Sequence, residues 1–102
     1  MSKIVSTRNK GFQMKFDNGL TISVQIGTMN YCSRRSFDLD AESEMKIHIV
    51  ESQDAEIAIW NETDQWFDFG TDQVKGWCSA DEVADWIHKV KSADSLKDIE
   101  NT

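Results

Sequence analysis

Two alternating runs of apolar and polar residues around an Asp-Asn-Gly turn constrain the fold most strongly. Residues 12–16 and 20–26 carry an apolar side chain at every second position, which is typical of half-buried strands. A two-residue loop would mix apolar and polar side chains on each face, whereas a three-residue loop gives one wholly apolar face. The pairs in that register are Phe16 with Leu20, Met14 with Ile22 and Phe12 with Val24. We therefore predict a hairpin with Gly19 in the left-handed conformation.

Further alternation predicts strands over residues 45–50, 56–60 and 66–69, joined to one another by short turns as in an antiparallel meander. A capping box formed by Ser79 and Glu82 predicts that a helix begins at residue 80 and runs to about residue 91. An apolar stripe at helical spacing supports this helix, made of Val83, Trp86, Ile87 and Val90.

These elements predict an α+β fold. We expect an antiparallel β-sheet of about five strands with one C-terminal α-helix packed on one face. The length of 102 residues fits a single domain spanning 1–102. Residues 92–102 are polar apart from Leu96 and Ile99, and are expected to fray or to form a short extra turn.

Charge is distributed unevenly along the chain, whose net charge is −7. Residues 1–37 contain six lysines and arginines against one acid, a net of +5, and they include all three arginines. Residues 38–72 contain eleven carboxylates against Lys46 alone, a net of −10, and residues 73–102 carry −2. A uniformly acidic DNA mimic would not concentrate its arginines in this way. An anion-binding pocket on an otherwise acidic protein is consistent with the pattern.

The absence of a secretory signal and of a membrane-spanning run in the sequence indicates the cellular compartment. The first residues form no long apolar stretch of the kind found in a secretory signal, and no run approaches the length of a membrane span. Cys32 and Cys78 are therefore expected to be reduced thiols in a cytosol. These features predict a cytoplasmic protein that does not insert into a membrane.

Catalytic and metal-binding motifs have little support. The sequence contains no nucleophile elbow, no glycine-rich phosphate loop and no pair of closely spaced zinc ligands. Cys32, Cys78, His48 and His88 are distant single residues, so we expect no metal site and no cofactor. One interpretation of Cys32 is a nucleophile whose pKa is lowered by Arg34 and Arg35, and the other is a small semi-buried thiol. The expectation is a protein that is not an enzyme, with a hydrolase as the remaining enzymatic alternative.

The segment around residues 30–35 is the strongest candidate for a ligand site. Arginine binds phosphate in a bidentate manner, and tyrosine can stack on a base. The expected ligand-binding residues are Arg8, Asn30, Tyr31, Arg34 and Arg35. Alternatively, the two adjacent arginines neutralise the acidic run at residues 38–44.

Trp60 is the candidate residue for an oligomer interface. It faces the opposite side of its predicted strand from Ile57 and Ile59, and so lies on the face that a single helix leaves uncovered. A large apolar side chain on such a face indicates a contact with a second copy or a surface on which a ligand stacks. We expect a homo-oligomer that uses Trp60.

The stretches KGFQMKFDNGLTISVQIG, MNYC and VKGWCSADEVADWI resemble a group of small proteins encoded by bacteriophages and prophages. In that group a GF-x-M-x-F-x-NG hairpin leads to an NYC loop and a capped C-terminal helix, and the resemblance covers about residues 8–91. It implies a phage accessory protein acting in the host cytoplasm. Small phage proteins include sponges that capture cyclic nucleotide immune signals, such as the Thoeris anti-defence sponges. This chain is similar to them in size, in its sheet with a C-terminal helix and in its arginine-aromatic loop.

Two functions follow from these observations. The first is a phage anti-defence protein that binds and sequesters an anionic nucleotide immune signal without catalysis. The alternative is an acidic protein-protein inhibitor, whose residues 38–72 occupy the nucleic-acid channel of a host nuclease or CRISPR effector. Neither function involves direct binding to DNA.

Overall fold

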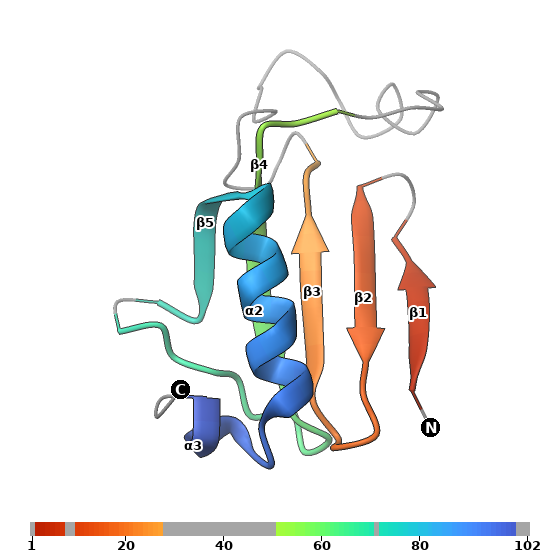
Figure 1. Cartoon of the computed structure of the whole chain (residues 1–102), viewed down its shortest axis with the longest axis vertical. Coiled ribbons are helices and arrows are strands. Elements are labelled where there is room, and N and C mark those ends of the chain that lie inside the picture. The colour runs from red at the N-terminus through yellow and green to blue at the C-terminus, as the bar shows by residue number, and fades with distance from the viewer. Residues whose placement is uncertain (1, 8–9, 28–50, 71, 100–102) are drawn as a thin grey trace.

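The computed structural model describes residues 2–7, 10–27, 51–70 and 72–99. These residues form one five-stranded antiparallel sheet, in which the strands lie in sequence order and a helix covers one face (Figure 1). The elements are β1 (Lys3–Ser6), β2 (Gly11–Lys15), β3 (Thr21–Gln25), β4 (Asp54–Trp60), β5 (Val74–Ser79), α2 (Ala80–Ser92) and α3 (Leu96–Ile99). The predicted α+β fold is confirmed.

The β2–β3 hairpin has the predicted three-residue loop. Phe12 is opposite Val24 and Met14 is opposite Ile22, while the Phe16 N–H donates to the Leu20 carbonyl at 2.9 Å. Gly19 has φ +87°, in the left-handed region that closes such a loop. The register is the one that keeps apolar side chains together on the face beneath the helix.

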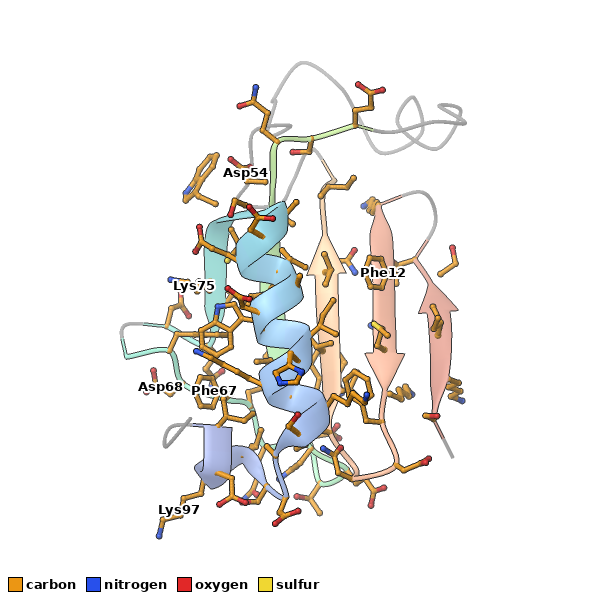
Figure 2. All side chains as sticks on the ribbon, in the orientation of Figure 1. Phe12, Asp54, Phe67, Asp68, Lys75 and Lys97 are labelled. Atoms are coloured by element: carbon orange, nitrogen blue, oxygen red, sulfur yellow. The ribbon has the colours of Figure 1, made fainter. Side chains whose placement is uncertain are left out.

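The predicted strands at residues 45–50 and 66–69 are not among the strands of the described sheet. Residues 45–50 lie outside the described part of the chain. Residues 66–69 do not form a strand, because only Trp66 makes a bridge to Trp60 and the ladder position beside β4 is taken by β5. Phe67 is buried instead against Trp86 of the helix, and its N–H donates to the Ile59 carbonyl at 2.8 Å (Figure 2).

The pairing of β4 with β5 contains an irregularity. The register shifts between Ala55 and Ile57, and Trp77 has φ +57°, an uncommon conformation for a bulky residue. A bulge of this kind interrupts the period-two pattern, because one strand carries an extra residue. For this reason alternation along residues 74–79 does not reveal the strand.

Helix α2 begins as the capping box predicts. The Ser79 hydroxyl accepts from the Glu82 N–H at 3.2 Å, and the Ser79 N–H donates to Glu82 Oε1 at 3.4 Å. The helix packs on β3, β4 and β5, and leaves the part of the sheet formed by β1 and β2 uncovered (Figure 1). None of the helices in the described residues is long and apolar enough to cross a membrane.

The core lies between the helix and the sheet. Its buried members are Leu20, Ile22, Val24, Ala55, Ile57, Ile59, Phe67, Cys78, Val90, Ala93 and Ile99. The predicted stripe of α2 supplies Val90, and the other three stripe residues pack partly buried against the same cluster. Residues 96–99 form the short extra turn α3, which adds Ile99 to the core.

A single side chain ties the hairpin loop to the end of the helix. The Asn18 amide donates to the Val90 carbonyl at 2.8 Å and to the Ala93 carbonyl at 2.7 Å. The Asn18 Oδ1 accepts from the Leu20 N–H at 3.0 Å. Because the last carbonyls of a helix have no partner within the helix, Asn18 satisfies groups that would otherwise need water.

Ser79→Ala is expected to lower the free energy of unfolding by about 1 kcal/mol, because the first turn of α2 loses its cap. Urea denaturation followed by circular dichroism measures this change. Ser2→Ala is a suitable control, since Ser2 is an exposed serine before β1 whose side chain makes no hydrogen bond with the described residues. Equal denaturation midpoints for the Ser79 variant and the wild type would contradict a stabilising cap.

Candidate functional site

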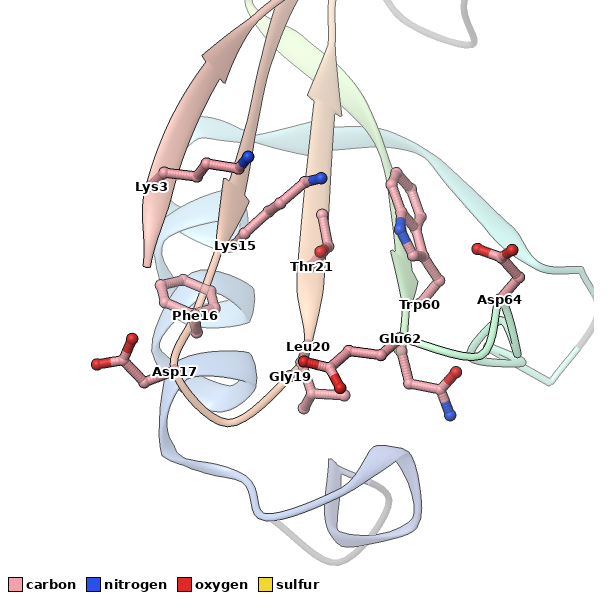
Figure 3. Close-up of a pocket in the computed structure, with 11 residues that line it drawn as sticks. Lys3, Lys15, Phe16, Asp17, Gly19, Leu20, Thr21, Trp60, Glu62 and Asp64 are labelled. Carbon is pink, nitrogen blue, oxygen red and sulfur yellow. The ribbon is translucent and has the colours of Figure 1, made fainter. Parts of the chain in front are cut away.

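The predicted ligand-binding segment cannot be placed on this structure. Arg8, Asn30, Tyr31, Arg34 and Arg35 all lie outside the described residues. Their role as phosphate and base ligands therefore stays a prediction. Trp60 is described, and it lies on the face of the sheet opposite the helix, as the alternation predicts (Figure 3).

Four side chains form a row across this face, which none of the described helices covers and which we call the open face. Lys3 is the register partner of Lys15, Lys15 is the partner of Thr21, and Thr21 is the partner of Trp60. Partners in an antiparallel sheet project to the same face. Neighbouring strands are about 4.8 Å apart, so roughly 10 Å separates the backbone of Lys15 from that of Trp60.

The row lines a pocket of about 350 Å³. The hairpin loop forms one end of this pocket, and the turn that follows β4 forms another wall (Figure 3). The remaining lining residues come from these two loops: Phe16, Asp17, Gly19, Leu20, Asn61, Glu62 and Asp64. A pocket of this size lies at the lower end of the range for small-molecule sites in proteins.

Trp60 presents one face of its indole to this pocket. Trp66 stacks on Trp60 with ring centroids 4.9 Å apart and an interplanar angle of 27°. Trp66 bridges to Trp60 on the side away from β3, whereas Thr21 is its partner on the β3 side. Trp66 therefore supports one face of the indole and leaves the face toward Thr21 for a ligand.

The Thr21 hydroxyl is a free polar group beside this indole. Thr21 is only 6% exposed, and its hydroxyl has no hydrogen-bonding partner among the described residues. No fully buried side-chain nitrogen or oxygen in the described residues lacks a partner, so the hydroxyl retains some exposure, and Thr21 lines the pocket. A nearly buried hydroxyl without a partner favours a ligand that supplies one.

The two lysines create a positive region at the other end of the row. Lys3 and Lys15 are directly opposite one another on adjacent strands, and Figure 3 shows both side chains extending over the open face. Neither has an ion-pair partner among the described residues. Like charges in this arrangement destabilise a sheet, and a bound anion removes that repulsion.

Cys78 is the cysteine among the described residues, and it is buried in the core. Burial raises the pKa of the Cys78 thiol, an effect that the nearby Lys75 opposes and that Glu82 and Asp54 reinforce. A thiol with a raised pKa is a poor nucleophile, because the thiolate is the reactive form. No group of three or more potential metal ligands is found in the described residues.

Local sequence patterns predict the positions of some of the residues that line this pocket. The three-residue loop already places Lys15 and Thr21 on one face of the hairpin, and Trp60 was identified on the open face. Lys3 was missed because a four-residue edge strand such as β1 gives too short an alternation to be recognised. The juxtaposition of Trp60 with Lys15 depends on the pairing of β3 with β4, which no local pattern reveals.

Comparison with known proteins does not assign this pocket. No protein-family model, no curated protein and no solved structure matches the chain.

Proposed function

We propose that this protein binds and sequesters an anionic nucleotide without chemically changing it. The observation that carries the proposal is the row of Lys3, Lys15, Thr21 and Trp60 along one pocket. A nucleotide has a planar ring at one end and phosphate at the other, which matches a row that begins with two lysines on β1 and β2 and ends with an indole on β4. The pocket is therefore the proposed nucleotide site.

Each part of the row has an energetic role. A base stacked on the free face of Trp60 contributes about 1–3 kcal/mol. Phosphate beside Lys3 and Lys15 gains charge-assisted hydrogen bonds and relieves the repulsion between the two ammonium groups. The Thr21 hydroxyl is suited to donate to a ribose or phosphate oxygen between them.

Sequestration requires affinity and stoichiometry, and needs no catalytic group. The resemblance to small phage proteins supports an anti-defence role, in which the protein captures a nucleotide immune signal in the host cytoplasm. Arg8, Asn30, Tyr31, Arg34 and Arg35 are kept as proposed additional ligands. In this proposal the protein's partner is the nucleotide. A host defence protein is the receptor that would otherwise bind that nucleotide.

Calorimetric titration with nucleoside 5′-monophosphates, cyclic nucleotides, guanosine and inorganic phosphate tests the site. The double variant Lys3→Gln and Lys15→Gln is expected to lose at least about a hundredfold in affinity for the nucleotides, because two charge-assisted contacts of about 1.5–3 kcal/mol each are removed. The free variant should be at least as stable as the wild type in urea, since the lysine pair is repulsive. Lys97→Gln removes one positive charge and is the matched control for the single variant Lys15→Gln, because Lys97 is exposed on α3 outside the pocket lining (Figure 2).

Two results would overturn this proposal. One is the absence of binding by the wild type to every nucleotide tested. The other is binding that Lys97→Gln weakens as much as Lys15→Gln does, since the effect would then follow net charge and not the pocket.

A second candidate function is the acidic inhibitor of a host nuclease or CRISPR effector. Residues 51–72 carry seven carboxylates and no lysine or arginine, and five of these carboxylates are on exposed residues. Such an inhibitor would tolerate loss of Lys3 and Lys15, and its binding would weaken with added salt. Asp68→Asn with Asp72→Asn would weaken it and leave nucleotide binding unchanged, because neither residue lines the pocket.

The homo-oligomer expected from Trp60 also remains a proposal. Trp60 belongs to the pocket, so a second copy docked on the open face would compete with a nucleotide there. Sedimentation of the wild type and of Trp60→Glu, with and without GMP, separates the two uses of this side chain. A monomer in every sample would remove the oligomer and leave the nucleotide site intact.

A further inference from the structure

We propose that Glu62 selects the base, and that the preferred ligand carries guanine. This inference rests on the proposed nucleotide site and names the part of the ligand that the site distinguishes. Glu62 lines the same pocket as Trp60, two residues further along the chain. The ring of the ligand stacks on the indole, and the Glu62 carboxylate accepts hydrogen bonds from the edge of that ring.

The position of Glu62 is defined by the hairpin loop. A Cβ built at Gly19 would lie 3.3 Å from both Cδ and Oε1 of Glu62. The glutamate side chain therefore rests against the one residue of the loop that has no side chain. Figure 3 shows its carboxylate at the end of the pocket near Gly19 and Leu20, below Thr21 and on the β3 side of Trp60.

The turn that carries Glu62 is well ordered by hydrogen bonds. The Asn61 N–H donates to the Gln65 carbonyl at 3.0 Å, and the Asn61 Oδ1 accepts from the N–H groups of Thr63 and Gln65, each at 3.0 Å. The Asp64 N–H also donates to the Asn61 carbonyl at 3.2 Å. Glu62 thus belongs to a hydrogen-bonded turn, and its side chain lies beside Gly19.

The Glu62 carboxylate is available for a ligand. It has no hydrogen bond and no ion pair with any described residue. An ionised carboxylate accepts through two oxygens and donates nothing. Its best partner is therefore a group that presents two neighbouring N–H donors, as an arginine guanidinium does in a bidentate pair.

Among the common bases, guanine is the one with two neighbouring donors on its Watson–Crick edge, N1–H and the N2 amino group. Adenine and cytosine each place a ring-nitrogen acceptor beside their amino group, and this lone pair would face the carboxylate. Uracil has one N–H between two carbonyl acceptors. A carboxylate at this position therefore accepts two bonds from guanine and repels part of the edge of the other three bases.

The arrangement of charge across the pocket agrees with this choice. The Lys3 ammonium lies over β2 and the Lys15 ammonium over β3 beside Thr21, whereas the Glu62 carboxylate lies below Thr21 near the hairpin loop (Figure 3). Asp64 also lines the pocket, but its carboxylate lies on the other side of the Trp60 ring in the same view. Glu62, and not Asp64, is on the side of the indole that remains open to a base.

Titration of the wild type, Glu62→Gln and Asp64→Asn with GMP, AMP, CMP and UMP tests this inference. The wild type should prefer GMP by roughly tenfold to a hundredfold, the discrimination expected of one good bidentate pair. Glu62→Gln should bind GMP more weakly and the other three nucleotides at least as tightly, because a negative charge is removed near an anionic ligand. Asp64→Asn removes the same charge and should keep the preference for GMP.

The outcomes separate this inference from the proposed function. Equal affinity of the wild type for all four nucleotides, lost on removal of Lys3 and Lys15, would overturn the guanine preference and leave the nucleotide site standing. A GMP preference that persists in Glu62→Gln would assign base selection to another residue and overturn the role of Glu62. No binding of any of the four nucleotides would overturn both proposals.

Discussion

Replacing Gly11 by alanine is expected to lower the free energy of unfolding by about 3 kcal/mol, or to prevent folding altogether. Gly11 has φ +156° at the start of β2, and a Cβ at this position would lie 1.9 Å from the Val24 carbonyl oxygen. That oxygen belongs to the backbone of β3, so the methyl group can be accommodated only if the two strands separate. The pairing of Gly11 with Gln25 would then be lost. Urea denaturation followed by tryptophan fluorescence measures the effect.

Gly19→Ala is the matched control for this variant. Gly19 also has a positive φ, of +87°, but the atoms nearest to its added Cβ are those of the Glu62 side chain at 3.3 Å. A flexible side chain can move, so only the backbone strain remains, which costs about 1 kcal/mol. Equal losses in the two variants would show that the close approach of β2 and β3 at Gly11 does not matter to stability.

Replacing Asn18 by aspartate is expected to cost about 3 kcal/mol, the second large effect. The substitution keeps the oxygen that accepts from the Leu20 N–H but removes the amide that donates to Val90 and Ala93. Loss of these bonds contributes about 1–3 kcal/mol. A carboxylate facing the carbonyl end of α2 adds an unfavourable interaction with the helix dipole of about 1 kcal/mol.

Asn18→Ala separates the two contributions. It removes the same donor and also the oxygen that accepts from the Leu20 N–H, but it adds no charge, so its loss of about 2 kcal/mol comes from hydrogen bonds alone. Thermal and urea denaturation at neutral pH compare the two variants. An aspartate variant no less stable than the alanine variant would contradict a charge effect at the end of α2.

Sequence patterns predict those elements whose structure is decided by contacts between residues close together in the chain. The β2–β3 register follows from residues 12–26 alone, because one register places every apolar side chain on a single face. The beginning of α2 follows from Ser79 and Glu82, which are three residues apart and satisfy one another. Both predictions were confirmed, since the interactions that decide them join residues close in the chain.

The misassigned strand shows where local patterns fail. Residues 66–69 alternate as a strand does, and the alternation correctly indicates that Phe67 is buried. It does not distinguish a strand from an extended segment that packs against Trp86 and contributes a single bridge. Residues 66–69 and β5 compete to pair with β4, and local sequence does not decide between them. The bulge at Trp77 conceals the segment that occupies this position.

The tie between the hairpin loop and the helix was likewise invisible in sequence. Asn18 was expected only as a turn residue, and its contacts with Val90 and Ala93 cross more than seventy positions. The meeting of Glu62 with Gly19 is of the same kind. Such contacts depend on how elements pack, because their partners have no periodic or short-range relation in the chain.

By itself the sequence determined the fold class, the hairpin register, the helix and the side of the sheet on which Trp60 lies. The alternation, the capping box and the apolar stripe each involve residues close together in the chain. The burial of apolar surface then favours a single arrangement of these elements. Only the tertiary structure brought Lys3, Lys15, Thr21, Trp60 and Glu62 around one pocket. Its walls come from three separate segments of the chain, and their meeting depends on the strand order, which puts β1, β2, β3 and β4 side by side.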